Sequence, residues 1–254
     1  MQKLTKYGPY PTPYLFHKTK ENQILYYIGS KHIYDPTITD WNVIDHYWHK
    51  FRKLTESQKR ITLVEGGNKR LKYRDPLKMR EWGESYYLWS LAKKYNIEVT
   101  SPEPNRIEQM KYLNKRFSKI DIVTTLFVEQ LCAYGVKTND IDEIKANLSS
   151  FLHYLESKSM WNKDLFEIKT IANNFRKITG KRLDLEDHDF HKELGNPYLK
   201  NNLINKITYK KSSYRDKYIL EKIKQLWQQH YSIFIIYGKN HAIAHELVIN
   251  SWSF

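Results

Sequence analysis

Residues 24–32 read Ile-Leu-Tyr-Tyr-Ile-Gly-Ser-Lys-His, and the architecture of the chain can be inferred from this segment. Its first five residues are apolar or aromatic without interruption, and such a run favours an interior strand of a sheet that is covered on both faces. Gly29 then allows a sharp turn of the chain, which places His32 at the carboxyl end of the strand. Ligands of open α/β sheets bind at that edge. We therefore expect His32 to take part in chemistry.

The same pattern recurs near the other end of the chain. Residues 233–241 read Ile-Phe-Ile-Ile-Tyr-Gly-Lys-Asn-His, so this apolar run also ends in Gly-x-x-His. One such motif is a weak signal, because a glycine and a histidine three positions apart arise often by chance. Two copies, each after one of the best strand candidates, are a stronger signal. If the two strands are parallel neighbours, His32 and His241 meet at one crevice.

Two further candidate strands end in carboxylates. Residues 61–64 predict a short buried strand, followed by Glu65 and two glycines that let a ligand approach closely. Residues 97–100 predict another strand, which ends at Ser-Pro-Glu-Pro, where the prolines hold Glu103 extended. The alternative for Glu65 is a turn with a surface acid. Glu84 begins a predicted helix, where the helix dipole favours a carboxylate even without a function.

The remaining chain is predicted to be mostly helical. An amphipathic helix begins at Thr39 or Asp40 and ends near Leu54, and residues of about 105–180 read as a helical insertion. Its expected helices cover residues 105–117, 120–134, 140–157 and 164–179. Residues 1–22 are interrupted by prolines and predict an irregular arm, and residues 68–80 predict an irregular, mobile segment.

Arg215 is expected in the first turn of a helix that runs from Ser212 or Ser213 to about Gln229. The helix dipole disfavours a cation there, so Arg215 is predicted to face an anion, either a substrate carboxylate or a developing oxyanion. The final strand is followed by a short terminal helix that carries His245 and Glu246.

Length and composition favour one α/β domain spanning residues 1–254, with a mixed, mainly parallel sheet flanked by helices. No apolar run approaches the roughly 18 to 20 residues of a membrane-spanning helix, and the first ten residues lack the apolar core of a secretory signal. We therefore expect a cytoplasmic protein without a membrane partner. Cys132 is the only cysteine, which excludes an internal disulfide and any multi-cysteine metal site.

The formal net charge is +14, from 42 Lys and Arg against 28 Asp and Glu, and it favours anionic partners. The basic residues are scattered and form no block of five or six, so nucleic-acid binding is the weaker interpretation.

Because a multi-cysteine site is excluded, histidine and carboxylate are the side chains that could bind a metal. Two histidines and up to three acidic residues at strand ends could supply the ligands of a divalent metal site. Zinc bound by two His and one Glu is one such site. Without metal, the same residues could act as general base and acid.

His188 and His191 lie one helical turn apart and have the spacing of a metal-binding pair. Acidic neighbours favour a solvated surface instead, and residues 181–211 give no other clear pattern. No Walker loop, Gly-x-Ser-x-Gly elbow, Gly-x-Gly-x-x-Gly or His-Glu-x-x-His motif is present, which removes the common nucleotide-binding and serine-hydrolase interpretations.

In the motifs around its predicted strand ends, the chain resembles the TraB, Tiki, erythromycin-esterase and ChaN-like superfamily. The resemblance covers roughly residues 24–250 and lies in an ordered series of motifs: Gly29-Ser-Lys-His32, Val64-Glu-Gly-Gly67, Gly83-Glu84, Ser101-Pro-Glu-Pro104, Arg215-Asp216 and Tyr237-Gly-Lys-Asn-His241. It implies two related halves with a helical insertion, each half bringing one Gly-x-x-His to a shared cleft. The resemblance also implies that His32, Glu65 and His241 lie at the heart of the cleft, with Glu84 and Arg215 beside them. We expect His32, Glu65 and His241 to hold a metal, and Glu84, Arg215 and Glu103 to be catalytic residues.

Members of this superfamily include metal-dependent proteases, esterases that open macrolide rings, and a haem-binding lipoprotein. The erythromycin-esterase pattern has Glu within its first Gly-x-x-His, where this chain has Ser30-Lys31, so macrolide hydrolysis is not implied. The leading expectation is a hydrolase that cleaves an amide or ester bond of a peptide or small molecule with zinc, manganese or cobalt. The alternative is a non-enzymatic protein that binds a small ligand such as haem in the same cleft.

Overall fold

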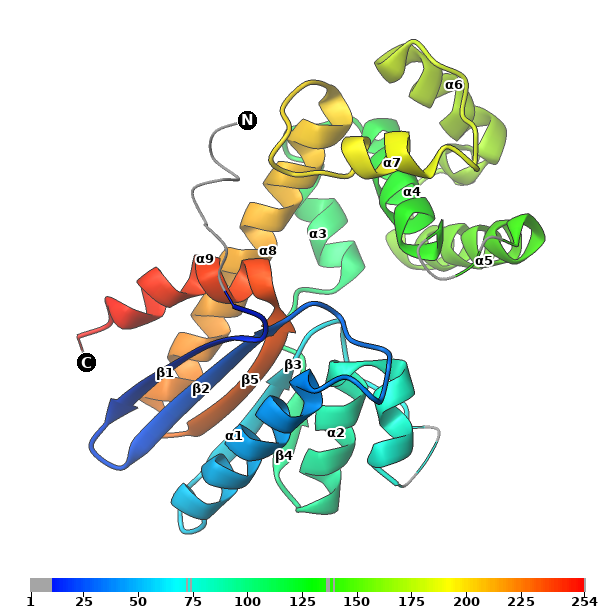
Figure 1. Ribbon diagram of the computed structural model, residues 1–254. Coiled ribbons are helices and arrows are strands. Elements are labelled where there is room, and N and C mark those ends of the chain that lie inside the picture. The colour runs from blue at the N-terminus through cyan, green and yellow to red at the C-terminus, as the bar shows by residue number, and fades with distance from the viewer. Residues whose placement is uncertain (1–10, 72, 74, 136–137, 139, 254) are drawn as a thin grey trace. The chain divides into compact units, whose positions relative to one another are not determined.

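The computed structural model describes residues 11–71, 73, 75–135, 138 and 140–253 (Figure 1). Its contacts divide the chain into two compact units: residues 104–215 form a helical unit, and the described residues before 104 and after 215 form a sheet unit. Each unit has its own hydrophobic core. The prediction of one domain for residues 1–254 stays a prediction.

The sheet unit contains a five-stranded sheet in the order β1-β2-β5-β3-β4. Its strands are β1 (Tyr14–Lys20), β2 (Gln23–Ser30), β3 (Arg60–Val64), β4 (Glu98–Thr100) and β5 (Ser232–Gly238). β1 runs antiparallel to β2, and the other neighbours are parallel. The predicted mixed, mainly parallel sheet flanked by helices is therefore confirmed. β5 lies between β2 and β3, which makes the two strands that end in Gly-x-x-His parallel neighbours, as predicted.

Helices cover both faces of this sheet because its inner strands are apolar on both sides. Figure 1 shows α1 (Asp40–Leu54) and α2 (Glu84–Lys94) on one face of the sheet. Tyr26 and Ile28 of β2 belong to the core cluster that these two helices share with the sheet. The alternate residues Leu25 and Tyr27 point to the opposite face, where α9 (Lys239–Asn250) and the second half of α8 (Leu203–Gln228) pack. The predicted helix starts at Asp40 and Glu84 are confirmed.

Three local predictions are wrong in the sheet unit. Residues 14–20 are a strand instead of an irregular arm, because the prolines end at Pro13 and leave the following backbone able to pair with β2. Gly29 lies inside β2 and does not turn the chain; the left-handed residue is His32, with φ 63°. Part of the segment predicted to be irregular is the 3-10 helix η2 (Leu77–Trp82).

Gly29 is required by close packing. A Cβ at this position would lie 2.7 Å from Ala242 Cβ and 2.9 Å from Lys239 Cα, both in α9. Contacts this short cannot be accommodated without a shift of the helix. The glycine therefore lets the start of α9 approach the end of β2.

The helical unit confirms the predicted helical segment and extends it. It contains α3 (Arg106–Leu113), α4 (Lys119–Gly135), α5 (Ile141–Ser159), η3 (Lys163–Phe166), α6 (Ile168–Thr179), α7 (His188–Leu194) and the first half of α8. α3 begins with a capping box between Asn105 and Glu108. The described residues contain no helix that is long and apolar enough to cross a membrane.

The start of α8 corrects the interpretation of Arg215. The helix begins at Leu203, because Ile204 and Ile207 continue its buried stripe upstream of Ser212. Arg215 lies in the middle of α8, so the dipole argument for an anionic partner does not apply.

Candidate functional site

The carboxyl ends of β2, β5 and β3 lie side by side at one edge of the sheet. Ser30 pairs with Gly238, and Val64 pairs with Ile236, so the residues after each strand emerge at the same edge. A Cβ on Gly238 would lie 3.1 Å from His32 Nε2 and 3.4 Å from Glu65 Oε2. His32 and Glu65 therefore both reach the backbone at the start of α9.

Glu65 is held at this edge by the first turn of α9. Its Oε2 accepts a hydrogen bond from the Gly238 backbone N–H at 2.6 Å, and its Oε1 lies 3.7 Å from His241 Nε2. The amino end of a helix favours a carboxylate, because its N–H groups and dipole are directed toward the negative charge. The predicted approach of Glu65 to His241 is therefore present in the structure.

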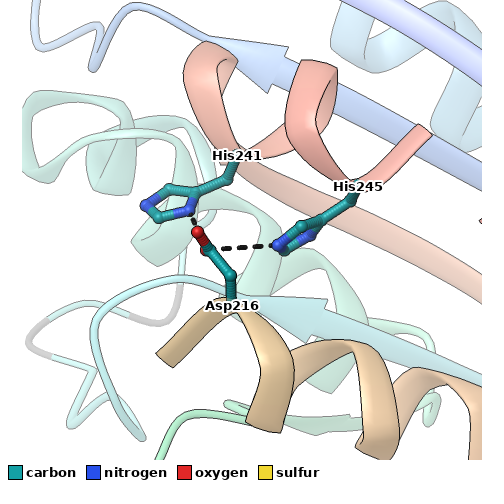
Figure 2. Close-up of side chains that lie close together, drawn as sticks. All are labelled: Asp216, His241 and His245. Carbon is teal, nitrogen blue, oxygen red and sulfur yellow. Dashed lines mark hydrogen bonds and ion pairs between the residues drawn. The ribbon is translucent and has the colours of Figure 1, made fainter. Parts of the chain in front are cut away.

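His241 also belongs to a second group, with Asp216 and His245. The two histidines are four residues apart on α9 and share one helix face, toward which α8 directs the Asp216 side chain (Figure 2). One oxygen, Asp216 Oδ1, lies 2.6 Å from His241 Nδ1 and 3.2 Å from His245 Nε2. The ligand atoms of the three side chains all lie within 4.8 Å of one another.

The charge on Asp216 decides which ring atoms carry protons. Burial favours a higher pKa for this carboxyl group, but the hydrogen bonds and charges of His241 and His245 outweigh burial and hold the pKa well below its usual range. An ionised carboxylate can only accept hydrogen bonds, so the ring nitrogens that face it must donate. In neutral His241 the proton is therefore on Nδ1, and the lone pair is on Nε2, the atom nearest Glu65.

Tyr27 extends this hydrogen-bonded array into the core. Its hydroxyl lies 2.9 Å from His245 Nδ1, and both side chains are fully buried. When His245 is neutral and donates from Nε2 to Asp216, its Nδ1 accepts the Tyr27 hydroxyl proton. The contact fixes the His245 ring from the side opposite Asp216, which in turn limits how Asp216 can move.

The other predicted residues occupy different surroundings. His32 is exposed, whereas Glu84 is buried at the first position of α2 and accepts a hydrogen bond from the Ser30 hydroxyl. Glu103 accepts the Gly66 backbone N–H at 2.9 Å, so it supports the loop that follows Glu65. Arg215 is the last residue of the helical unit. The catalytic roles assigned to Glu84, Glu103 and Arg215 stay predictions.

Three members of the hydrogen-bonded array, Asp216, His245 and Tyr27, have no predicted chemical role. The sequence places His245 on a terminal helix and Tyr27 in a strand, and Asp216 is the second residue of a motif. The available signal was the spacing of His241 and His245, because residues four apart on a helix lie on one face. No comparable signal exists for Asp216, which approaches them from another helix.

The spacing of ligand atoms around His241 differs between its Nε2 side and its Nδ1 side. Ligand atoms about 2.1 Å from a tetrahedral ion lie about 3.4 Å apart. The separation of 3.7 Å between His241 Nε2 and Glu65 Oε1 is close to this value, whereas the 2.6 Å between Asp216 and His241 is that of a direct hydrogen bond. Among the described residues, the three-residue group with metal-binding spacing is Asp216, His241 and His245. The predicted set of His32, Glu65 and His241 does not form such a group, although His241 Nε2 and Glu65 Oε1 are spaced as two ligands of one ion.

The His188 and His191 pair differs from its prediction. His191 is completely buried instead of solvated, and neither of its ring nitrogens has a hydrogen-bond partner among the described residues. Burial lowers the pKa of His191, although nearby Asp187 opposes the shift. Within the described chain, the pair does not form a three-residue group with metal-binding spacing. His191 is therefore part of the helical core, packed near Phe175 and Phe190.

Comparisons of this chain with protein-family models, curated proteins and solved structures gave no match.

Proposed function

We propose that this chain is a hydrolase that cleaves an amide or ester bond, with His241 at the reacting centre. The observation that carries the proposal is the Asp216–His241 hydrogen bond, which presents His241 Nε2 toward Glu65 at the carboxyl edge of the sheet. An imidazole oriented by a half-buried carboxylate is an arrangement suited both to general-base catalysis and to metal binding. The ordered motifs support the further proposal of kinship with the TraB, Tiki, erythromycin-esterase and ChaN-like superfamily and its two related halves.

We assign His241 Nε2 and Glu65 as the residues that would hold a divalent ion, with His32 as the third candidate ligand. Bound zinc, manganese or cobalt would lower the pKa of a water molecule and polarise a carbonyl group. Asp216 keeps the His241 proton on Nδ1, so that the Nε2 lone pair faces the reacting side. The Gly238 N–H holds Glu65 against rotation away from His241.

The same side chains give His241 a defined proton chemistry of its own. When no metal occupies its lone pair, Nε2 can accept a proton from water, and the negative charge of Asp216 stabilises the imidazolium that forms. His245 and Tyr27 act one step further away, by holding Asp216 in place. Removing the Asp216 charge should therefore lower the rate without displacing the backbone.

The test is a turnover panel of peptides, carboxylic esters and lactones, run with zinc, manganese or cobalt and compared with a chelated sample. We expect hydrolysis of at least one class and a loss of at least about 100-fold in His241→Ala. His46→Ala is the matched control, because His46 is an exposed histidine on α1. Wild-type turnover in His241→Ala would reject the assignment.

Elemental analysis and absorption spectra separate the hydrolase from the alternative ligand-binding protein. If the chain is the proposed hydrolase, elemental analysis should find a divalent ion in the wild type and none in the Glu65→Ala, His241→Ala double variant. A chain that hydrolyses nothing in the panel but binds haem through His32 or His241 would favour the binding protein instead.

A further inference from the structure

Two large aromatic side chains are exposed near the start of α2. Tyr34 follows β2 and is 51% exposed, and Trp82 ends η2 and is 42% exposed. Trp82 packs against the half-buried Tyr86 of α2, with ring centroids 5.7 Å apart. Exposed single aromatics are common, but rings gathered beside a polar centre are typical of ligand-binding sites.

A series of contacts connects the Trp82–Tyr86 pair to Glu65. The Lys69 ammonium group lies 5.1 Å from the centre of the Tyr86 ring and donates a hydrogen bond to the Gly66 carbonyl at 2.8 Å. Gly66 directly follows Glu65 in the chain. The aromatic pair and the carboxylate are thus linked through one lysine and one loop.

Tyr34 borders the same region from the other side. Its Cε1 lies 3.1 Å from the position that a Cβ on Gly83 would occupy, and Gly83 separates Trp82 from Glu84 in the chain. Glu84, the residue after Gly83, accepts a hydrogen bond from the Ser30 hydroxyl at the end of β2. Tyr34 and the start of α2 therefore lie at the edge of the sheet where β2 ends.

We propose that Tyr34, Trp82 and Tyr86 form a binding surface for a planar aromatic group of the substrate, next to the bond that is cleaved at Glu65 and His241. The proposal rests on the proposed function and names its substrate class as aryl amides or aryl esters. Ring faces and edges attract another aromatic ring more than an aliphatic ring of similar size. A cationic ligand is disfavoured, because the Lys69 ammonium group already lies over Tyr86.

The test measures binding without turnover. Protein labelled with 5-fluorotryptophan has seven tryptophan signals, and Trp82→Phe assigns the signal of Trp82. Benzamide and cyclohexanecarboxamide carry the same amide on a planar and a non-planar ring, so they are the matched probes. We expect benzamide to shift the Trp82 signal in a saturable manner, and cyclohexanecarboxamide to bind at least severalfold more weakly.

Two variants locate the binding surface. Tyr34→Ala should weaken benzamide binding by about twofold to tenfold, the range expected for loss of one aromatic contact. Tyr154→Ala removes a tyrosine of similar exposure from α5 and should leave binding unchanged. Unchanged signals of the other tryptophans show that the variant is folded.

The outcomes separate this inference from the hydrolase assignment. No saturable benzamide shift, equal binding of the two amides, or unchanged binding in Tyr34→Ala would each overturn the aromatic surface and leave the reacting centre untouched. Aromatic binding with wild-type turnover in His241→Ala would instead retain the surface and reject the hydrolytic centre.

Discussion

Replacing Asp216 tests the hydrogen-bonded array most directly. Asp216→Ala removes the oxygen that accepts from both His241 and His245. A hydrogen bond to a charged group contributes about 1.5 to 3 kcal/mol, and the fully buried His245 would be left with an unsatisfied N–H. Since Asp216 is partly exposed, water replaces part of the loss at His241. We expect the free energy of unfolding to fall by about 3 to 5 kcal/mol at pH 7.

Asp216→Asn is the matched variant, because it keeps the shape and removes the charge. Both histidines bond to the same oxygen, Oδ1, and the amide oxygen of Asn can still accept from both. Neutral hydrogen bonds are about half as strong as charge-assisted ones. The expected loss is therefore about 1 to 3 kcal/mol, between the wild type and Asp216→Ala.

The difference between wild type and Asp216→Asn should depend on pH in one direction. Because the pKa of Asp216 is lowered in the folded protein, its contribution is fully present above the ordinary carboxyl pKa of 3.8 and is lost as the pH falls through the folded-state value. Asn does not titrate, so the stability difference between wild type and Asp216→Asn should shrink as the pH falls from about 5 to 2.

Urea denaturation followed by circular dichroism at several pH values gives each free energy. An Asp216→Ala variant that remains within about 0.5 kcal/mol of wild type, the usual range of a neutral surface substitution, would show that Asp216 does not stabilise the two histidines. A difference between wild type and Asp216→Asn that does not change at low pH would show that the charge of Asp216 is not what binds the two imidazoles.

Three further predictions follow from packing and burial. Gly29→Ala should lower the free energy of unfolding by about 1 to 3 kcal/mol in urea denaturation, because the added methyl group meets Ala242 of α9; an unchanged midpoint would contradict the close approach. Burial lowers the pKa of Lys211 to about 8 in spite of its ion pair with Glu129. The folded state then binds fewer protons than the unfolded state between about pH 8 and 10.5. The free energy of unfolding of wild type should therefore rise relative to that of Lys211→Met across this pH range. A stability difference between the two proteins that stays constant with pH would argue against the lowered pKa. Burial also raises the pKa of the Cys132 thiol from 9.0 to about 12. Because the thiolate is the reactive form, labelling by iodoacetamide at pH 8 should be on the order of a thousandfold slower in the folded protein than in urea. Comparable labelling rates would show that the thiol is not buried.

The main strands and helices could be predicted because their signals are local. Residues 24–28 and 233–237 are apolar runs that a covered parallel strand requires, and the helix starts at Asp40 and Glu84 follow from nearby residues. β1 was missed because an edge strand needs only one hydrogen-bonding partner and no continuous apolar run. The start of α8 was missed because Ser212 resembles a helix cap, although buried residues continue the helix upstream of it.

The positions of His32, Glu65 and His241 after apolar strands can be predicted from the sequence, because strand propensity is a property of neighbouring residues. The hydrogen-bond partner of His241 depends on how distant elements pack. Asp216 comes from α8, and its carboxylate reaches His241 and His245 only because both helices pack on one face of the sheet. Local patterns do not encode distances between separate helices, so the array that orients His241 becomes visible only when the core has formed.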